Sequence, residues 1–384
     1  MHLARICAMG IVLALSASCI GSMSVSAETE AGAAAEAGEF ADFGAKWPDK
    51  FCDGDEVEIS DNSYKSHDIN VRIDRYDNYG VGDRITGDLN ESGDVTVSDA
   101  VLCTKLLSEA SVKLSDTGTL NADVNEDDIV NLIDSQRILQ YLDGSMKDTD
   151  FFIEHKLVYF VADIYVRSLE NFRGGFASNY YSTDKNDVGK IAEIGRKHNA
   201  VFAINCDYCS YRTNGIIYRN GVMYRENKRS DLCLIYKNGE ADILSDSAYR
   251  KLTDEQKSEI WHTISFGPKL VHNYQVDTKN PGGVVALQQP RSVFGYYEPG
   301  HYCFVIIEGR RPGYSGGLFL PDVCNLMVDL GVKEAFNMDG GSSSVIALNG
   351  QQVNWPAWTG RATSDILYLV EKDQIVPMSD PPEQ

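Results

Sequence analysis

Beyond its first thirty residues, this 384-residue chain lacks any apolar run of the roughly 18 residues that a membrane-spanning helix needs. Basic residues are also few, because 35 lysines and arginines stand against 56 aspartates and glutamates, for a net charge of −21. Nucleic acids and anionic membranes attract basic surfaces. We therefore expect neither a nucleic-acid partner nor a membrane span. The balance suits an extracellular protein that binds calcium or acts on carbohydrate.

The chain lacks the paired cysteines and histidines of a zinc site. Cys206 and Cys209 form a C-x-x-C pair, but there is no second pair, and none of the seven histidines lies at zinc spacing to another. A disulfide, or two buried small residues, is therefore favoured over a redox or zinc site. Seven cysteines follow residue 27, so at least one thiol is unpaired within the chain.

The first 27 residues have the layout of a secretory signal peptide. A positive start precedes an apolar core, Ile6 to Ile20, and Val25-Ser26-Ala27 forms a small-x-small cleavage site. A lipoprotein signal at Cys19 is the weaker alternative, because Ser16 stands where an aliphatic residue is usual. We expect a secreted protein, in an extracellular or cell-surface assembly, whose mature chain begins with an acidic linker over residues 28–63.

Two acidic segments have the spacing of a 12-residue calcium loop, in which hard oxygens alternate around the ion and glycine permits a sharp turn. The first is Asp88 to Asp99, with Gly93 at position 6; the second is Asp123 to Asp134, with Asp128 in place of that glycine. The sequence therefore predicts two calcium ions. The expected ligands are Asp88, Asn90, Ser92, Asp94, Thr96 and Asp99, and then Asp123, Asn125, Asp127, Ile129, Asn131 and Asp134.

A helical pattern follows each loop, and two such repeats in register resemble a type I dockerin, the module that binds enzymes to cohesin scaffolds. The resemblance implies a small all-α calcium-binding module over residues 82–147, with a cohesin module as partner. An alternating segment, Ile69 to Ile73, precedes the loops and predicts a strand. We expect residues 64–81 to be the first strand of a second domain, so that the module is inserted into it. The alternative is that Ser63 to Asp77 is linker.

Residues 148–373 have the pattern of a mixed-sheet α+β domain, followed by a C-terminal tail at 374–384. Leu157 to Val166 predicts a long buried strand, and Asp187 to Asn199 predicts a helix that leads into the short strand Val201 to Ile204. Asn-Gly pairs at 220–221, 238–239 and 349–350 each stand between apolar runs. Such pairs are typical of type I′ hairpin turns, so antiparallel hairpins are expected.

The most informative stretch is Ala335 to Gly350, AFNMDGGSSSVIALNG. A helical pattern over Pro321 to Leu330 leads into a buried strand, which ends in Asp339 and a Gly/Ser turn. Backbone N–H groups of such a turn can hold an anion beside the acid. A flexible surface loop is the alternative interpretation.

This stretch resembles the signature of the phosphodiester glycosidase family, with Ser342 and Val345 replacing a usual glycine and threonine. Further ordered segments resemble that family too: FAINCDYC, SFGPKLV, PRSVFG, VIIEGRRPGYSGGLFL and GRATSDILYLV. Cys206 departs from the usual glycine. The resemblance implies hydrolysis of a carbohydrate sugar-1-phosphodiester.

This chemistry needs an acid, a second carboxylate and groups that hold phosphate. The expected catalytic residues are Asp339 and Glu308, with Asp207 as a third candidate, because each follows an apolar strand. Guanidinium groups match phosphate oxygens. The expected substrate-binding residues are Asn205, Arg291, Arg310, Gly340, Gly341 and Ser343.

Several alternatives accompany this interpretation. Trp355 and Trp358 are predicted either to stack on a sugar ring or to pack in the core. A serine hydrolase would use Ser343 with His262, His272 or His301, but a G-x-S-x-G elbow is absent. A non-catalytic glycan-binding or adaptor module of a cellulosome-like assembly is the alternative outside catalysis.

Overall fold

The computed structural model describes residues 40–77, 85–125, 129–147, 157–227, 231–277, 287–311 and 314–381. The expected signal peptide and the start of the expected linker lie outside these residues. Within them, no helix is both long and apolar enough to cross a membrane.

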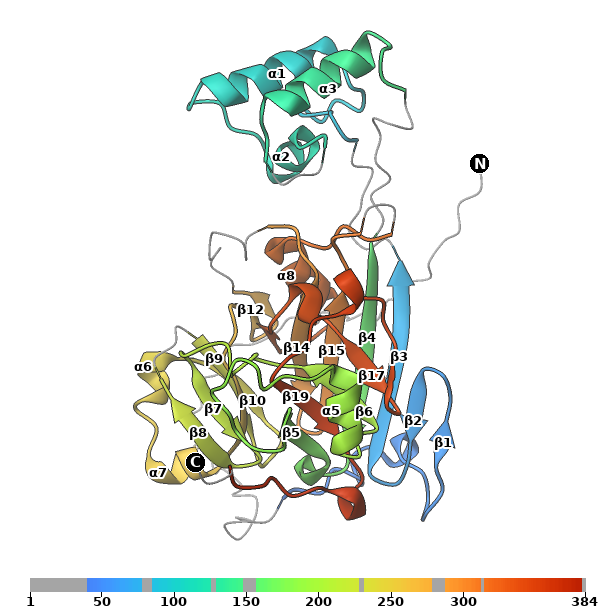
Figure 1. Ribbon diagram of the computed structural model, residues 1–384, viewed down its shortest axis with the longest axis vertical. Helices are drawn as coiled ribbons and strands as arrows, with labels where there is room; N and C mark the ends of the chain where they lie inside the picture. The colour runs from blue at the N-terminus through green and yellow to red at the C-terminus, as the bar shows by residue number, and fades with distance from the viewer. Residues whose placement is uncertain are drawn as a thin grey trace, which may run out of the picture. The chain divides into compact units, whose positions relative to one another are not determined.

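A nine-stranded sheet and a five-stranded sheet form the centre of the larger domain (Figure 1). In order across it, the nine-stranded sheet contains β1 (Glu58–Ile59), β2 (Ser63–Lys65), β3 (Ile69–Asp77), β4 (Val158–Val166), β15 (His301–Ile307), β14 (Arg291–Glu298), β16 (Glu334–Asn337), β12 (Lys269–His272) and β13 (Gln275–Val276). The five-stranded sheet contains β18 (Gln351–Gln352), β17 (Ile346–Leu348), β6 (Phe202–Asn205), β19 (Asp365–Leu369) and β5 (Phe172–Phe176).

Smaller elements complete the domain. A three-stranded sheet contains β10 (Ala241–Ser245), β9 (Asp231–Tyr236) and β11 (Ile260–Ile264), and a hairpin contains β7 (Ile216–Arg219) and β8 (Val222–Glu226). The helices are α5 (Ile191–Lys197), α6 (Asp246–Tyr249), α7 (Asp254–Ser258) and α8 (Leu320–Asp329). Short 3₁₀ turns are η1 (Pro48–Lys50), η2 (Leu169–Asn171), η4 (Gly341–Ser343), η5 (Ala357–Thr359) and η6 (Lys372–Gln374).

The domain has four layers, because each sheet is apolar on both faces. Phe304 of β15 faces the five-stranded sheet and packs in one cluster with Phe202 of β6. Its neighbour Val305 points the opposite way and packs in a second cluster with Val323 of α8. On the outer face of the five-stranded sheet, Ile194 of α5 covers β6 and β19. The order is therefore helix, sheet, sheet, helix.

The α+β class is confirmed, but the expectation of mixed sheets is wrong, because every pairing between described strands is antiparallel. Helix α8 connects β15 to β16, yet β14 lies between those two strands. Likewise α5 connects β5 to β6, and β19 lies between them. In each case a third strand lies between the two strands that the helix connects.

All three Asn-Gly pairs lie in hairpins. Asn220-Gly221 and Asn349-Gly350 have positive φ at both residues, as type I′ turns require. The pair at 238–239 differs, since only Gly239 has positive φ and the N–H of Tyr236 donates to the Glu240 carbonyl. Residues 237–239 therefore form a three-residue loop that ends in a left-handed glycine.

Strand β3 pairs with β4 over nine residues, from Ile69 opposite Val166 to Asp77 opposite Val158. The chain between these strands carries three helices, α1 (Val97–Ser108), α2 (Asp116–Ala122) and α3 (Leu132–Leu142). They enclose a small apolar cluster of their own, which includes Leu89, Ala100 and Ile138. Capping boxes begin α1 and α3, each formed with the aspartate at position 12 of the preceding loop.

Two expected solvated segments pack against the domain instead. Within the expected linker, Phe43 is buried in the main core, where Gly239 and Gly300 leave room for its ring. Within the expected tail, Met378 packs near Phe176, and the Ser379 N–H donates to the Asn179 carbonyl at 2.9 Å. The expectation of a solvated linker is therefore wrong around Phe43, Phe51 and Cys52, which are buried, whereas residues 53–62 are exposed. The C-terminal tail stays a prediction, since residues 374–381 are exposed or half-buried.

Candidate active site

The ends of two buried strands from different sheets meet at the candidate site. The Asp339 N–H, just after β16, donates to the carbonyl of Cys206, just after β6, at 3.0 Å. Asn205 Nδ2 donates to the Asp339 carbonyl at 2.5 Å. Asn205 Oδ1 accepts from Ser292 Oγ at 2.9 Å. The Asn205 side chain therefore joins the two strand ends, and its predicted place in the site becomes a positioning role.

The glycine turn after Asp339 fits tightly under Pro290. A Cβ atom on Gly340 would lie 2.7 Å from the Pro290 carbonyl oxygen. The Gly341 N–H donates to that oxygen at 2.9 Å, so it is not available to an anion. This corrects the predicted role of Gly341 as a donor. Among the described residues none accepts a hydrogen bond from the Gly340 N–H, and this donor remains for a ligand.

Asp339 is held by an arginine from a distant part of the sequence. Arg361 Nη2 donates to Asp339 Oδ2 at 2.6 Å, and Arg361 Nε donates to Ser343 Oγ at 2.9 Å. Burial raises the pKa of the Asp339 carboxyl, while Arg361 and Ser343 oppose that rise. Arg361 belongs to the segment GRATSDILYLV, and nothing in its sequence spacing predicts that it reaches a turn some twenty residues earlier.

Glu308 follows β15 and is fully buried. Its Oε1 accepts from Asn354 Nδ2 at 2.9 Å and from the Trp355 N–H at 2.5 Å. Burial raises the pKa of the Glu308 carboxyl against the opposing effect of these donors and of the Tyr314 hydroxyl. Asn354 Nδ2 also donates to the Ser344 carbonyl at 2.9 Å. Glu308 is therefore linked, through one asparagine, to the turn that follows Asp339.

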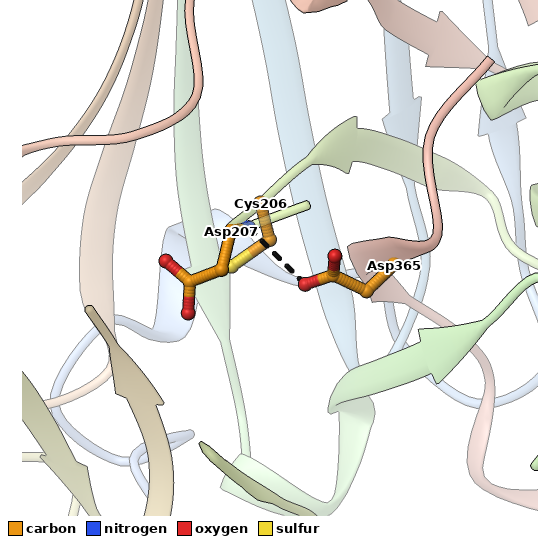
Figure 2. Close-up of side chains that lie close together, drawn as sticks. All are labelled: Cys206, Asp207 and Asp365. Atoms are coloured by element: carbon orange, nitrogen blue, oxygen red, sulfur yellow. Dashed lines mark hydrogen bonds between the residues drawn. The ribbon is translucent and has the colours of Figure 1, made fainter. Parts of the chain in front are cut away.

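Asp207 belongs to a different set of groups. Its Oδ1 accepts from the N–H groups of Ser265 and Phe266, both at 2.9 Å, and its Oδ2 accepts from Arg219 Nη2 at 3.3 Å. Asp365 Oδ2 accepts from the same Arg219 atom at 2.8 Å and from the Asp207 N–H at 3.1 Å, the bond that Figure 2 draws. Because protein donors occupy both its oxygens, Asp207 is a structural residue, and its predicted catalytic role is not supported.

Cys206, Asp207 and Asp365 lie close enough to hold a cation, with ligand atoms within 4.8 Å of one another (Figure 2). Arg219 supplies that positive charge, since its Nη2 also lies 3.2 Å from Cys206 Sγ. Ion pairing raises the pKa of Arg219 despite its complete burial. Burial opposes ionisation of Asp365, but Arg219 and backbone N–H donors outweigh it and lower the pKa of Asp365. No metal is needed here.

The C-x-x-C pair does not form a disulfide. Cys206 and Cys209 are buried free thiols, and burial raises the pKa of both. Of the two alternatives left open by the sequence, the structure favours buried small residues. Cys206 points at Arg219 rather than at the glycine turn, so its side chain does not obstruct the site where the family has glycine.

The two predicted phosphate-binding arginines lie on one side of the turn. The Arg310 guanidinium lies 3.2 Å from the position that a Cβ atom on Gly341 would take, and it donates to Gln289. Arg291 is buried and donates to the carbonyls of Leu318 at 3.2 Å and Leu287 at 2.5 Å. Burial and the neighbouring Arg310 lower the pKa of Arg291 to about 10. Arg310 is therefore an exposed residue beside the turn, whereas Arg291 is buried against main-chain carbonyls, and their roles in phosphate binding stay predictions.

The structure does not assemble a serine-hydrolase triad. Ser343 Oγ accepts from Arg361. His262 is buried against the Phe172 carbonyl, His272 bonds Glu334 at 2.7 Å, and His301 bonds Asp163 at 2.8 Å. That alternative is wrong, because each histidine already has a partner remote from the turn.

The two candidate tryptophans do not pack in the core. The side chains of Trp355 and Trp358 are 55% and 73% exposed. Trp358 adopts φ 48° and ψ 41°, in the left-handed region, and Arg310 also has positive φ. Strained non-glycine residues of this kind gather at ligand-binding sites more often than elsewhere.

A buried strand-end carboxylate, an arginine that bonds it and a glycine turn with Arg310 beside it thus lie together on an α+β scaffold. Residues 198–370 match the model of the phosphodiester glycosidase family. Residues 86–143 match the type I dockerin domain. Both resemblances predicted from the sequence are confirmed.

Similar proteins include an uncharacterised SPbeta prophage-derived protein, YomE, of Bacillus subtilis, which is 24% identical over 191 residues. This match covers 46% of the chain and 28% of the relative, so the chain spans less than a third of that protein. The catalytic domain of zebrafish N-acetylglucosamine-1-phosphodiester alpha-N-acetylglucosaminidase, auto-inhibited by its pro-peptide, matches with a TM-score of 0.45 and 18% identity, over 59% of this chain and 80% of that one. A putative exported protein from Burkholderia pseudomallei matches with a TM-score of 0.42 and 11% identity, over 87% and 100% of the two chains.

Proposed function

We propose that the larger domain is a secreted hydrolase of sugar-1-phosphodiesters on extracellular or cell-surface glycans. The observation that carries the proposal is Asp339, buried at a strand end, held by Arg361 and followed by a glycine turn with arginines beside it. Substrate phosphate would bind at Arg310 and the Gly340 N–H. The reacting sugar carbon would then lie within reach of Asp339.

The two carboxyl groups differ in a way that assigns their roles. Arg361 bonds Asp339 directly and opposes the rise in the pKa of its carboxyl that burial causes, so Asp339 is the proposed carboxylate for the anomeric carbon or its attacking water. Glu308 accepts only from neutral donors, an amide and a backbone N–H, among its printed hydrogen bonds. Burial raises the pKa of the Glu308 carboxyl, and none of these donors is charged, so Glu308 is the proposed proton donor to the leaving oxygen.

Replacing Glu308 by glutamine is expected to stabilise the domain at neutral pH while lowering turnover of a sugar-1-phosphodiester by about two orders of magnitude or more. The pKa of Glu308 is higher in the folded protein than in the unfolded chain. The protonated group therefore contributes its full stability below the pKa of the unfolded chain, and this contribution is lost as the pH rises through the pKa of the folded protein. The variant should therefore exceed the wild type in thermal stability at pH 7, and the difference should shrink toward pH 4. An unchanged difference across this range would contradict the assignment.

The alternative function, a glycan-binding module without catalysis, is separated from hydrolysis by product analysis. A hydrolase releases a free sugar and a phosphomonoester from a generic sugar-1-phosphodiester, whereas a binding module releases neither. We expect release. Tight binding of the intact diester without products would favour the alternative.

The inserted helical module is proposed to bind two calcium ions and a cohesin module of a scaffold protein. Asp88 and Asp99 of the first loop and Asp134 of the second are buried, and their oxygens accept from backbone N–H groups such as those of Gly93, Thr96 and Val124. Among the described residues, no lysine or arginine pairs with these three carboxylates. Buried anions without a cationic partner fit a bound metal ion.

The twelve predicted ligands remain a proposal, and Asp127 lies outside the described residues. Calcium, when bound, would neutralise the clustered carboxylates and lock each loop onto the helix that follows. The chain's own contribution is already visible, since Asp99 and Asp134 each cap the helix after their loop. Each loop therefore connects ion binding to helix formation.

Chelation of calcium should unfold α1 to α3 and abolish cohesin binding, with little change in phosphodiester turnover. Without an ion, the loop carboxylates repel one another.

Asp99→Asn should weaken calcium affinity about tenfold or more, because it removes charge from the first loop and weakens its helix cap. Titration calorimetry measures the affinity, with Glu109→Gln as a control outside the loops. Absence of calcium uptake by the wild type would contradict the proposal.

The domain is proposed to begin before the module, so that the module is an insertion. Ile69, Val71 and Ile73 of β3 are buried in the main core, and β3 covers the edge of β4. Replacing residues 82–147 with a short Gly/Ser loop should therefore leave a folded domain. A chain that starts at Thr149 should melt lower by roughly 10 °C or more, since it loses the strands β1 to β3 and the core side chains of Phe43, Tyr64, Ile69, Val71 and Ile73. Equal melting temperatures for the two chains would refute the insertion.

A further inference from the structure

Four arginines beside the candidate site each lie over an aromatic ring. The guanidinium carbon is 5.5 Å from the ring centre for Arg310 over Trp358, and 3.2 Å for Arg311 over Trp355. It is 4.5 Å for Arg361 over Tyr208, and 3.9 Å for Arg212 over Phe266. Such pairs present a positive charge and a flat apolar surface next to each other.

These pairs border the groups already described. Arg310 lies against Gly341, and Arg361 bonds Asp339 and Ser343. The backbone N–H of Trp355 donates to Glu308. The charge of Arg212 acts on the Asp339 carboxyl and lowers its pKa, against the larger effect of burial. Residues 207–212 and 354–361 thus both border the turn, and they meet where Arg361 lies over Tyr208.

The positive charge beside this turn exceeds what one phosphodiester would neutralise. Arg291, Arg212 and Arg311 donate to main-chain carbonyls, of Leu318, Phe266 and Trp355 respectively. Bonds to carbonyl oxygens satisfy the donors but leave the charge. Burial lowers the pKa of Arg212 and Arg291, because a buried guanidinium loses part of its hydration. The chain as a whole has a net charge of −21, so this local excess of positive charge contrasts with the rest of the molecule.

Exposed rings belong to both of these segments. Trp355 and Trp358 are exposed in one segment, and in the other Tyr211, 57% exposed, stacks on Tyr208 with ring centres 5.3 Å apart. Exposed aromatic faces bind the apolar faces of sugar rings. A single sugar-1-phosphodiester has one phosphate and one reacting sugar, so it would occupy only part of this surface.

We propose that the ligand is a polymer of alternating sugar and phosphodiester groups, of which one unit reacts at Asp339 while its neighbours bind the arginine–aromatic pairs on either side. This proposal rests on the proposed function. In the reaction the bond between the sugar C1 and the phosphate oxygen breaks, and water supplies a hydroxyl to C1. The second proton of the water goes to the phosphate oxygen that leaves C1. The products are therefore a free sugar end and a phosphomonoester end. Water is the only co-reactant.

The test compares ligands that differ in the number of repeats. The Asp339→Asn variant, which should not turn over, is titrated calorimetrically with a synthetic sugar-1-phosphate methyl diester and with a four-repeat oligomer of the same unit. We expect the oligomer to bind at least tenfold more tightly. Arg311→Gln and Trp358→Ala should each reduce that ratio roughly three- to tenfold, while Tyr274→Ala, a matched exposed aromatic in the turn between β12 and β13, should not.

The two proposals fail in distinguishable ways. Equal affinity for the diester and the oligomer would overturn the polymer ligand, even if wild-type protein hydrolyses the diester. Equal binding of a single-stranded DNA with the same number of phosphates would also overturn it, in favour of a general polyanion surface. Tight oligomer binding combined with no hydrolysis of either ligand by the wild type would support the polymer ligand and refute the hydrolase.

Discussion

Asp339→Asn is expected to fold normally and to lose phosphodiester turnover by about three orders of magnitude or more, the scale typical of losing a catalytic carboxylate. The substitution keeps the shape of the side chain and can keep one hydrogen bond to Arg361, which now bonds Asp339 at 2.6 Å. It removes the negative charge that would stabilise an oxocarbenium-like transition state. The measurement is release of phosphomonoester from a sugar-1-phosphodiester.

Two comparisons make this result specific. Asp322→Asn, at the start of α8, changes the same functional groups on an acid that the proposed mechanism does not use, and turnover should be retained. Arg361→Lys keeps a positive charge but loses the fork that holds Asp339 and Ser343 together, so kcat should fall more than substrate affinity. Wild-type turnover in a folded Asp339→Asn variant would refute its catalytic role.

The second large effect concerns stability. Arg219→Met should destabilise the larger domain by about 3–5 kcal/mol, because it leaves two buried carboxylates, Asp207 and Asp365, without their cation. All three side chains are buried, and Arg219 also donates to the carbonyls of Tyr218 and Thr263. Methionine is long enough to fill much of the space but donates nothing. Chemical denaturation monitored by tryptophan fluorescence gives the free energy of unfolding.

The control is an arginine in an exposed ion pair. Arg250 bonds Asp246 at 2.8 Å one helical turn away, and its side chain is 46% exposed. Arg250→Met should therefore change stability far less than Arg219→Met does. Similar losses in the two variants would show that the buried cluster is not the special feature described. A loss in Arg219→Met that disappears in the Asp207→Asn, Asp365→Asn background would support it.

The sequence predicted the parts of the site that lie on one continuous segment. An apolar run followed by Asp339 and two glycines is visible in a single window, and the strand, acid and turn are all present. Sequence periodicity carries no information on which strand ends meet, so the bond from Asn205 to the Asp339 carbonyl could not be foreseen. Arg361 was not predicted for the same reason, since only the folding of the segment between β18 and β19 brings it to the acid.

Asp207 shows the converse error. Its local pattern, a buried strand followed by an acid, is the same as that of Asp339. The difference lies in Arg219, the last residue of β7, which bonds Asp207. The same arginine also bonds Asp365 at the start of β19. Whether a strand-end carboxylate meets a ligand or a buried arginine depends on tertiary pairing. Only the folded structure distinguishes these outcomes.

The pairing of β3 with β4 also determines how the helical module would respond to proteolysis. Two chain segments connect the module to the larger domain, one to β3 and the other to β4. A cut in the first leaves the module covalently bound to β4. A cut in the second leaves it bound to β3, which nine paired residues and a buried apolar face hold in the nine-stranded sheet. A domain joined to a module in this way stays attached after any single cleavage of the two connections, whereas a domain joined through one terminal linker is released by the first cut.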